Sequence, residues 1–599
     1  MTLPTWISQR VPALGAIKAE GIRNQLGRPE LDRLTVLVRE AAQNSWDARD
    51  DDQDGPVRFD LELRTLDADA SRAWADALAV GAPDSAHLPL LPALSERQLR
   101  VLFVSDRGTT GLGGPVRADQ VTDDEDHDYV SFVLNVGDPR DTEHGGGTYG
   151  FGKAIFFLTS QASTILVYTR CRAVDGNPET RLVGCALGPS YVDGGSAYTG
   201  RHWFGVPCDD AIEPLRGAAA DELASRLGFP SFGPGEFGTT VAVIAPELDG
   251  RTVAEAGRRL ALSVLWHLWP KMLARDGIPS MQFRVMADGE SFDVPPPTEH
   301  PVLREFVRAF ETLHDEGTTV TYGSGRRPVG LLNLRTAFSP VPEVDDVGRE
   351  AGLGDGIHHT CLMRVPDLVV EYRGGPPLPD PRVWYAGVFK VLPECDEAFA
   401  TAEPPTHDAW LPQLLAGDDK SVVRTTLRKI EEAMRAHATP ATPEERAPEA
   451  SDGLARMSRK LGGLLAPASA EGAGPVTGGG GGSSSRPRAL RMDGAPRWEL
   501  VDGRPLLVQP FEVTASHAVT AEAALRVRVW GAGGRETEPP PGAGEPELVG
   551  WRDEEGNRHP PGPLTIPASA SRRWVALVHV PEDTACEIRV REGREEGDA

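Results

Sequence analysis

The 599-residue sequence predicts a multidomain α/β protein with an all-β domain at its C-terminal end. The chain is roughly three to five times as long as an average single domain. Helical and strand patterns alternate up to about residue 437, whereas short runs rich in Val, Leu and Trp, separated by Gly and Pro, follow residue 487. A segment dominated by Ala, Pro, Gly and Ser lies between these two regions.

Residues 1–250 are expected to form the first α/β domain, because helical and strand periods alternate along them. The expected elements are helices over 31–49 and after 150, and strands near 57–64, 100–105, 163–170, 182–187 and 239–245. Residues 251–437 are expected to form a second α/β domain. It opens with a helix over Val253–Ala274 and closes with a helix near Lys420–His437.

Residues 438–487 are predicted to be a flexible linker, since they include the runs Gly478–Gly482 and Ser483–Ser485. Residues 488–599 are predicted to be a small β-sandwich that serves binding or assembly. Its expected strands are Pro505–Val513, Ala523–Trp530, Leu564–Ile566 and Arg573–Val580.

The net charge of −26 disfavours nonspecific binding of nucleic acid by the whole surface, although it leaves room for a local basic groove. The opening MTLPTWISQR does not resemble a signal peptide, and the best apolar stretch, Leu260–Trp266, is far too short to span a membrane. We therefore expect a soluble, cytoplasmic protein. Six cysteines without a C-x-x-C pair predict reduced, structural thiols rather than zinc modules.

Three polar residues share one face of the helix predicted over 31–49. Glu40, Asn44 and Asp47 follow one another at i, i+4 and i+7, while the apolar residues occupy another face. By itself this pattern is typical of a solvated helix. The motifs downstream favour a functional role instead.

Two glycine-rich segments follow that helix. VLFVSDRGTTGLGG, residues 101–114, reads as a strand that ends in Asp106 before a turn, where a carboxylate can accept a hydrogen bond from an exocyclic amine. GGGTYGFGK, residues 145–153, offers main-chain N–H groups and the charge of Lys153 to phosphates. It is not a Walker A loop, because Ala154 follows the lysine.

In their order and spacing, REAAQNSWDA, SDRGTTGLGG, GGGTYGFGK and FGTTVAVI resemble the N box, the G1 box, the G2 box with its lid, and the final threonine-bearing strand of the GHKL ATPases. This superfamily includes gyrase B subunits, heat-shock chaperones, histidine kinases and MutL. The resemblance covers roughly residues 15–250. It implies a Bergerat fold, in which a mixed sheet carries helices on one face and ATP lies between a helix and the lid.

The resemblance also assigns roles to individual residues. It implies that Glu40 is the catalytic base, that Asn44 holds Mg²⁺, that Asp47 supports the site and that Asp106 binds the adenine amine. The remaining residues expected to bind the nucleotide are Gly108 and Gly111 in G1, Gly145, Gly146, Gly147, Gly150, Gly152 and Lys153 in the lid, and Thr239. A simple D-x-G-x-G motif would have glycine where Thr110 stands. His144 is either a phosphate contact or an ordinary loop residue.

The region after residue 250 leaves several alternatives open. By position it resembles the transducer domain of gyrase and MutL, with Lys390 or Arg335 as the cation that contacts the γ-phosphate, or as an ordinary strand residue. The segment AEPPTHDAWLP, residues 402–412, is either a rigid loop against the nucleotide domain or a partner, or a helix entry packed by Trp410. The set His358, His359, Cys361 and His407 has no recognised metal-ligand spacing.

The leading hypothesis is a Mg²⁺-dependent ATPase that closes its lid and dimerises on binding ATP, and reopens on hydrolysis. Glu40 favours hydrolysis over transfer to histidine, and too few residues precede the N box for a histidine-kinase hairpin. As for MutL and MORC-type ATPases, the switch would act on a partner protein, encoded nearby, or on a nucleic-acid complex, and bacterial antiviral defence is one such role. The alternatives are a nonenzymatic nucleotide-sensing scaffold, a GHKL-type protein kinase and, less favoured, a chaperone.

Overall fold

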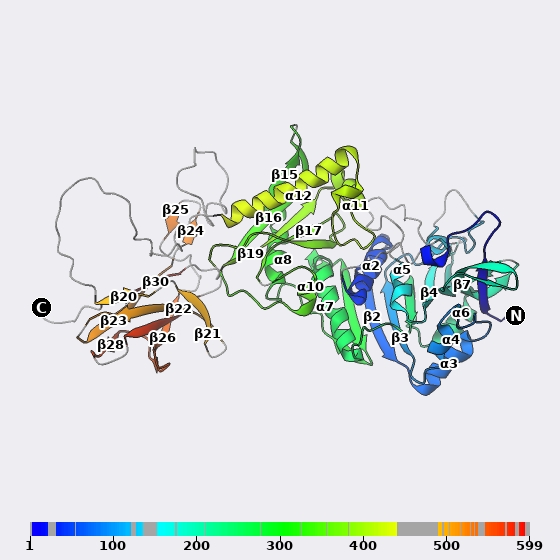
Figure 1. Cartoon of the computed structure of the whole chain (residues 1–599), viewed down its shortest axis with the longest axis horizontal. Helices are drawn as coiled ribbons and strands as arrows, with labels where there is room; N and C mark the ends of the chain where they lie inside the picture. The colour runs from blue at the N-terminus through cyan, green and yellow to red at the C-terminus, as the bar shows by residue number, and fades with distance from the viewer. Residues whose placement is uncertain are drawn as a thin grey trace.

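The computed structural model describes residues 3–21, 31–53, 55–120, 127–135, 153–173, 176–209, 211–275, 277–324, 326–354, 356–380, 383–439, 489–493, 496–501, 504–515, 517–527, 529–531, 534–536, 546–568, 572–580 and 586–592. Within them the chain is a mixed α/β multidomain protein with an all-β C-terminal region, as the sequence predicts (Figure 1). No helix in these ranges is long and apolar enough to cross a membrane.

The first sheet is large and mixed. All neighbours along its main path are antiparallel except β2 and β13, which are parallel. Its order is β1 (Thr5–Arg10), β7 (Ser196–Cys208), β5 (Pro178–Leu187), β4 (Thr164–Arg172), β10 (Gly238–Ile244), β3 (Arg100–Arg107), β2 (Val57–Thr65), β13 (Met281–Ala287) and β14 (Glu290–Phe292), with the short strands β6 (Tyr191–Asp193), β8 (Ala211–Glu213) and β9 (Leu215–Arg216) at its side.

Helices cover both faces of this sheet. Because side chains alternate along a strand, Leu102 and Val104 of β3 join one core, and Val101 and Phe103 join another. The first core includes α2 (Arg33–Asp47), α5 (Ala154–Thr159) and α7 (Val253–Met272). The second includes α3 (Ala68–Leu78), α4 (Leu90–Leu94) and α6 (Ala218–Arg226). The expectation that helices cover only one face of the sheet is therefore wrong. Strand β3 is apolar on both faces, and a helical layer packs against each of them.

The first α/β unit extends past the expected boundary at residue 250. α7 crosses over the sheet, and β13 then pairs with β2 from Met281 opposite Val57 to Ala287 opposite Leu63. A parallel partner needs such a crossover connection, and α7 buries its apolar residues against the sheet and α2. The first sheet thus continues to β14. The expected boundary at residue 250 lies just before α7, so α7, β13 and β14 follow it in the sequence but belong to the first unit.

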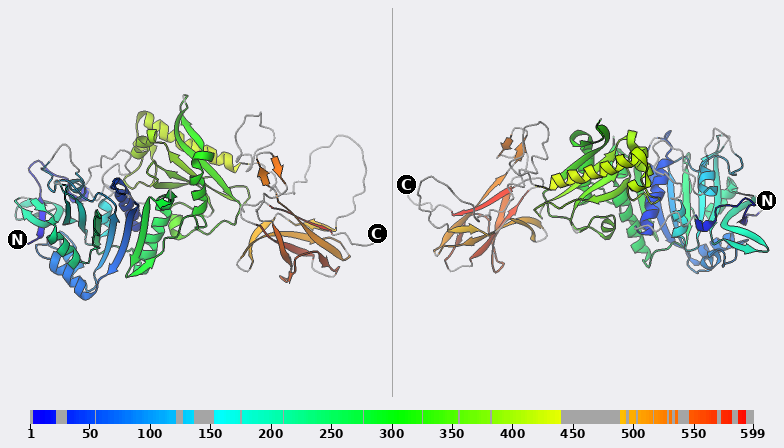
Figure 2. Two further views of the ribbon diagram at one scale, coloured as in Figure 1. Left: turned by 180° about the vertical axis from the view of Figure 1, so that it is seen from behind. Right: turned by 45° about the horizontal axis from the view of Figure 1, so that its top comes forward.

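The second unit, residues 303–438, is built on a second sheet. This sheet runs in the order β15 (Thr318–Tyr322), β16 (Arg327–Ala337), β19 (Trp384–Val391), β17 (His358–Met363) and β18 (Val369–Gly374). One face packs against the end of α7 and against α8 (Leu303–Glu311), α9 (Leu313–Glu316) and α10 (Asp346–Glu350). The other face packs against α11 (Asp396–Thr401) and α12 (Gly417–Ala438), which lies across the sheet in Figure 2. The short β11 (Ala274–Arg275) and β12 (Ile278–Pro279) pair with each other.

In the parts of the C-terminal region that the structure describes, the regular elements are all strands. A six-stranded sheet consists of β20 (Leu490–Met492), β21 (Arg497–Val501), β22 (Arg504–Val513), β26 (Glu547–Asp553), β27 (Arg558–His559) and β29 (Arg573–His579), and a three-stranded sheet of β23 (Val519–Val527), β28 (Leu564–Ile566) and β30 (Cys586–Glu592). A hairpin of β24 (Val529–Gly531) and β25 (Gly534–Glu536) is separate. Phe511, Trp551 and Trp574 of the larger sheet share one core with residues of the smaller one. The linker prediction for 438–487 falls almost wholly outside the described residues.

Candidate functional site

Helix α2 places two consecutive charged side chains in the interior. Asp32 caps the helix by accepting a hydrogen bond from the N–H of Leu34, at 2.9 Å. Arg39 and Glu40 are then buried between the sheet, α7 and the second unit, with Glu40 only 3% exposed. Oε1 of Glu40 has no hydrogen-bond partner among the described residues. Burial raises the pKa of Glu40, and the charges of His407 and Arg39 oppose part of that rise.

Asn44 and Asp47 lie further along the same helix, and both are half-buried. No hydrogen bond links the Asn44 side chain to another described residue, so its amide oxygen is available to a ligand. Asp47 lies near cations of both units. Burial lowers the pKa of Lys271 on α7, and the charge of Asp47 opposes that fall; in the second unit the same charge contributes, after those of Glu403 and Asp396, to a raised pKa of Arg364 despite burial. The three residues predicted together thus have different neighbours.

Asp106, at the end of β3, collects hydrogen bonds from three elements. Oδ1 accepts from the Thr109 hydroxyl at 2.5 Å and from the main-chain N–H of Thr239 at 3.0 Å, and Oδ2 accepts from the Ser45 hydroxyl at 3.1 Å. Burial raises the pKa of Asp106, and the hydrogen bond from Thr109 opposes that rise. A carboxylate has about four acceptor positions, so about one remains for a further donor.

Close backbone approach explains the glycines around Asp106. Gly111 has a φ of +68°, and a Cβ there would lie 2.3 Å from the carbonyl oxygen of Arg170. A Cβ on Gly238 would lie 2.3 Å from the carbonyl oxygen of Asp106. Gly108 also has a positive φ, +82°, but a Cβ there meets only an ordinary contact at 3.4 Å. The positive φ is therefore the feature of the structure that favours glycine at 108.

Thr239 is joined to β4 as well as to β3. Its hydroxyl lies 3.1 Å from the hydroxyl of Thr169, which also donates to the carbonyl of Gly238 and accepts from the N–H of Leu112, both at 2.9 Å. Sequence reasoning missed Ser45, Thr169 and Gly238. Ser45 follows Asn44 and Gly238 stands inside the FGTT motif, so a local signal existed for these two, whereas Thr169 resembles any threonine in a strand.

Lys153 is buried just before α5 and does not point into open space. Its ammonium donates to the carbonyl oxygens of Ser131, inside the π-helical turn Val130–Leu134, and of Asn135, directly after that turn, the latter at 2.5 Å. Five predicted lid glycines lie outside the described residues, as does His144: Gly145, Gly146, Gly147, Gly150 and Gly152.

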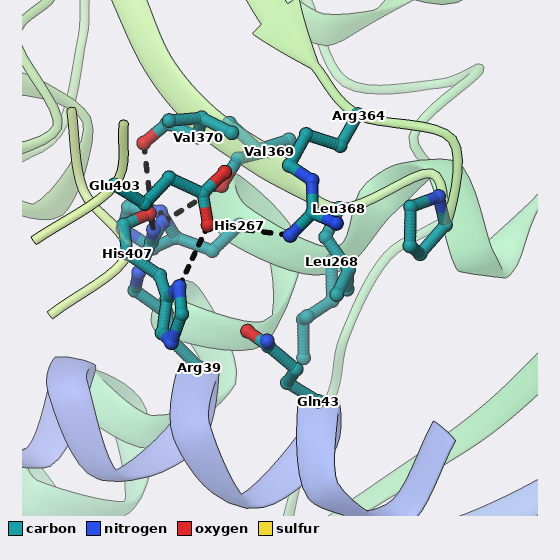
Figure 3. A pocket seen from close by; sticks show the side chains of 11 residues that line it. Arg39, Gln43, His267, Leu268, Arg364, Leu368, Val369, Val370, Glu403 and His407 are labelled. Atoms are coloured by element: carbon teal, nitrogen blue, oxygen red, sulfur yellow. Dashed lines mark hydrogen bonds and ion pairs between the residues drawn. The ribbon is translucent and has the colours of Figure 1, made fainter. Parts of the chain in front are cut away.

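The second unit docks on α2 through Arg39. One guanidinium nitrogen donates to the carbonyl of Val369 at 3.0 Å and lies 2.7 Å from Nδ1 of His267, and the other donates to the carbonyl of His407 at 2.6 Å (Figure 3). Gln43, one turn further along α2, lines the same interface around a cavity of about 20 Å³, which is large enough for about one water.

The segment 402–412 has features of both interpretations made from the sequence: it is packed by Trp410, and it contacts the first unit. Trp410 is 2% exposed and packs edge-on against Phe399. Its indole N–H donates to Glu403 at 3.3 Å, and the other oxygen of Glu403 lies 2.6 Å from Nδ1 of His407. His407 adopts a φ of +49°, which is uncommon for a residue with a side chain. The segment is therefore a packed loop that also contacts α2.

The other cations considered from the sequence are paired with carboxylates. Lys390 forms an ion pair with Asp367, and Arg335 one with Glu316 at 3.1 Å. Lys271 was not considered, yet it is 1% exposed and lies 3.1 Å from the centroid of the Trp46 ring. Burial lowers its pKa far below the usual value for lysine. The contact of Lys271 with Trp46 depends on how α7 packs against α2, so no local pattern in the sequence indicates it.

Within the ranges that the structure describes, no group of three or more His, Cys, Asp and Glu side chains is arranged to hold a metal ion. No protein-family model matches the chain, and a search of curated proteins finds no match.

Proposed function

We propose that this protein is a Mg²⁺-dependent ATPase of the GHKL type, with a Bergerat-type nucleotide domain that carries an additional helical layer on the second face of its sheet, and a transducer-like second unit. The observation that carries the proposal is the Asp106 carboxylate. Three donors from the G1 turn, β10 and α2 fix its orientation and leave about one acceptor position. An acceptor held in this way suits the exocyclic amine of adenine.

The surrounding residues fit the adenine end of ATP. Thr239 and Thr169 add hydroxyl groups beside Asp106, and Gly111 and Gly238 allow the neighbouring main chains to approach closely. A site built to accept a hydrogen bond from a ligand amine rejects an analogue that lacks the amine, because the acceptor is then left without its partner.

Glu40 fits the role of general base. Burial makes its carboxylate more basic, while the positive charges of His407 and Arg39 favour the ionised form that accepts a proton. Its oxygen Oε1, which lacks a partner among the described residues, is free to take a hydrogen bond from an attacking water molecule. The proton of that water would pass to the carboxylate.

Asn44, one helical turn after Glu40, would hold Mg²⁺ through its amide oxygen. Mg²⁺ prefers oxygen ligands and takes only one or two of them from a protein when phosphates and water supply the rest. Bound Mg²⁺ would neutralise phosphate charge. The helix keeps Asn44 and Glu40 on one face, so the base and the metal ligand address the same end of the substrate.

The docking of the second unit on α2 supports a switch. Arg39, the residue before Glu40, donates hydrogen bonds to the carbonyls of Val369 and His407. A movement of α2 on nucleotide binding would therefore be transmitted to the second unit. We extend the proposal to an ATP-dependent homodimer that controls a partner protein or a nucleic-acid complex, with antiviral defence as one role. A nucleotide-sensing scaffold and a GHKL-type protein kinase are the alternatives.

The direct test compares the binding of Mg·ATP and Mg·ITP by titration calorimetry. Inosine carries a carbonyl oxygen where adenine carries its amine, and the two phosphate chains are identical. We expect ATP to bind at least about 100-fold more tightly, which corresponds to about 2.7 kcal/mol. Equal affinities would remove the adenine-binding role of Asp106, and no binding of either nucleotide would overturn the proposal.

A further inference from the structure

A second pocket lies on the face of the first sheet that α6 covers, opposite the face that carries α2. Because side chains alternate along β4, Val167 joins the core that includes α2, whereas Tyr168 joins the core that includes α6. Tyr168 and Arg170 line this pocket, and Thr169 between them faces the Asp106 site. The pocket has a volume of about 640 Å³. Sites for small molecules usually measure roughly 300–1,000 Å³.

Three aromatic rings form the apolar part of the pocket. The ring of Tyr168 lies 5.8 Å from that of Phe229 and 5.0 Å from that of Phe232, measured between centroids. Tyr168 and Phe229 are nearly buried, and Phe232 is half-buried. The parts of these rings that line the pocket can pack against a further ring, which edge-to-face and offset-stacked contacts would stabilise.

Two opposite charges lie beside these rings, Arg170 on β4 and Asp221 in the first turn of α6. One guanidinium nitrogen of Arg170 donates to the carbonyl of Gly233 at 3.0 Å, and the guanidinium makes no other hydrogen bond to a described residue. The Tyr168 hydroxyl donates to Oδ1 of Asp221 at 2.8 Å, and Oδ2 of Asp221 has no such partner within the described ranges. The pocket thus presents N–H donors of a cation and one oxygen of an anion to a ligand.

The hydrogen bond between Tyr168 and Asp221 fixes one wall of the pocket. Burial raises the pKa of Tyr168, the hydrogen bond to Asp221 raises it further, and the charge of Arg170 opposes part of the rise. The phenol therefore stays protonated and keeps donating to Asp221. Since both charges act on the same phenol, Arg170 and Asp221 face the same part of the pocket.

The loop that carries Phe232 is held in place by Arg107, the residue after Asp106. Arg107 is 6% exposed, donates to the carbonyl of Pro230 at 3.2 Å, and places its guanidinium carbon 4.0 Å from the centroid of the Phe232 ring. A pocket whose walls are fixed before binding loses little conformational entropy when a ligand enters.

We propose that this pocket binds a small zwitterion that carries an aromatic ring, namely an aromatic amino acid in its free form. The carboxylate accepts from Arg170, the ammonium donates to Oδ2 of Asp221, and the ring packs against Phe229 and Phe232. Arg170 and Asp221 are the only charged residues among the described residues that line the pocket, so the lining has no net charge and favours a neutral zwitterion over an anion or a cation. The inference does not rest on the proposed ATPase function.

The first experiment compares three ligands by ligand-observed NMR titration of the full chain. The probes are L-phenylalanine, 2-phenylethylamine, which lacks the carboxylate, and 3-phenylpropionate, which lacks the ammonium. We expect each of the last two to bind at least about tenfold more weakly than L-phenylalanine, because each leaves one charged group of the pocket without its partner. Equal affinities for the three probes, or no binding of L-phenylalanine, would overturn the proposal.

The second experiment assigns each charge of the ligand to one residue. Asp221→Asn, which can still accept from Tyr168, should weaken L-phenylalanine at least about tenfold and leave 3-phenylpropionate unaffected. Arg170→Gln should weaken L-phenylalanine to the same degree and leave 2-phenylethylamine unaffected. Glu222→Gln and Arg226→Gln, exposed on α6 and outside the pocket lining, are the matched controls and should bind all three probes as the wild type does. Unchanged binding of L-phenylalanine in both pocket variants would contradict the assignment.

A third variant fills the pocket without removing either charge. Ser225 is exposed on α6 and lines the pocket, so Ser225→Trp should fold like the wild type, as its urea unfolding midpoint would show, and should lose the binding of L-phenylalanine. Glu222→Trp, which places the same side chain on α6 outside the lining, is its control and should retain binding. Wild-type affinity in Ser225→Trp would place the ligand elsewhere and overturn the proposal.

Discussion

The main-chain N–H of Thr239 donates a 3.0 Å hydrogen bond to Oδ1 of Asp106. The two residues lie at one end of the antiparallel pair β3 and β10, where Gly238 has no Cβ to meet the carbonyl oxygen of Asp106. A main-chain donor is fixed by the sheet and cannot rotate away as a side chain can. The orientation of the Asp106 carboxylate is thus set by the fold before any ligand binds.

Replacing Asp106 by asparagine should alter the choice of base more than the fold. The amide oxygen can still accept from Thr109 and Thr239, and the amide nitrogen can face Ser45, whose hydroxyl can turn to accept. The variant loses the acceptor for the adenine amine and gains a donor. We expect at least about tenfold weaker binding of Mg·ATP and a smaller preference for ATP over ITP, measured by calorimetry.

Asp69→Asn is the matched control, because this carboxylate is 93% exposed on α3. It should leave both affinities unchanged. Retention of the full ATP preference by Asp106→Asn would separate Asp106 from adenine recognition.

Gly111→Ala should destabilise the first unit by considerably more than Gly176→Ala. Both glycines have φ near +70 to +80°, so both substitutions carry similar backbone strain of about 1 kcal/mol. A Cβ at Gly111 would also lie 2.3 Å from the Arg170 carbonyl, whereas nothing lies within 4 Å of one at Gly176. Urea unfolding should show an additional loss of at least about 1 kcal/mol for Gly111→Ala, and equal losses would contradict the close approach of the G1 turn to β4.

Two buried histidines, His202 and His359, and the partly buried His437 should make the protein less stable in mild acid. Burial lowers the pKa of His202, His359 and His437 to about 4, compared with 6.5 in an unfolded chain. Between these values the unfolded state binds protons that the native state does not, so this contribution to stability is complete above pH 6.5 and is lost as the pH falls towards 4. Each histidine contributes about 1.4 kcal/mol per pH unit.

His437→Gln isolates one of these contributions, because a glutamine amide can keep the bond to the Thr336 hydroxyl. Chemical denaturation at pH 6.5 and pH 5 should show that the variant loses about 2 kcal/mol less stability over this interval than the wild type. The same loss in both proteins would mean that His437 is not buried as a neutral ring.

Arg364→Met should strongly destabilise the second unit, because it leaves Asp396 as a buried acid without its ion-pair partner and removes the arginine from Glu403, which keeps only His407 and Trp410. The expected loss is about 3–5 kcal/mol in urea unfolding. Arg428→Met, on the exposed face of α12 beside Glu432, is the control and should cost at most about 1 kcal/mol. Similar losses in the two variants would show that the Arg364 network is not closed to solvent.

Local patterns predicted part of this arrangement. Helical spacing placed Glu40, Asn44 and Asp47 on one helix, and the apolar run before it placed Asp106 at the end of a strand, because periodicity and turn residues act over a few positions. The pairing of β13 with β2 involves strands more than 200 residues apart and could not be read from either strand alone. The second layer, formed by helices α3, α4 and α6, was not predicted. A strand such as β3 that is apolar on both faces indicates that both faces are covered, but not which elements cover them.

The contact between α2 and the second unit was beyond sequence reasoning for the same physical reason. Arg39 bonds the carbonyl of His407, 368 positions away, and that carbonyl is turned towards α2 by a residue with positive φ. Lys271 over Trp46 likewise depends on how α7 crosses α2. Such contacts are specified by packing rather than by spacing along the chain.

The most direct test of the proposed ATPase function is steady-state phosphate release from Mg·ATP by the wild type and by Glu40→Ala, at several protein concentrations. The proposal predicts turnover in the wild type that rises more than linearly with protein concentration, because dimerisation gates hydrolysis, and loss of nearly all turnover in Glu40→Ala with Mg·ATP still bound. Equal turnover in both proteins, or none in the wild type despite bound Mg·ATP, would contradict it.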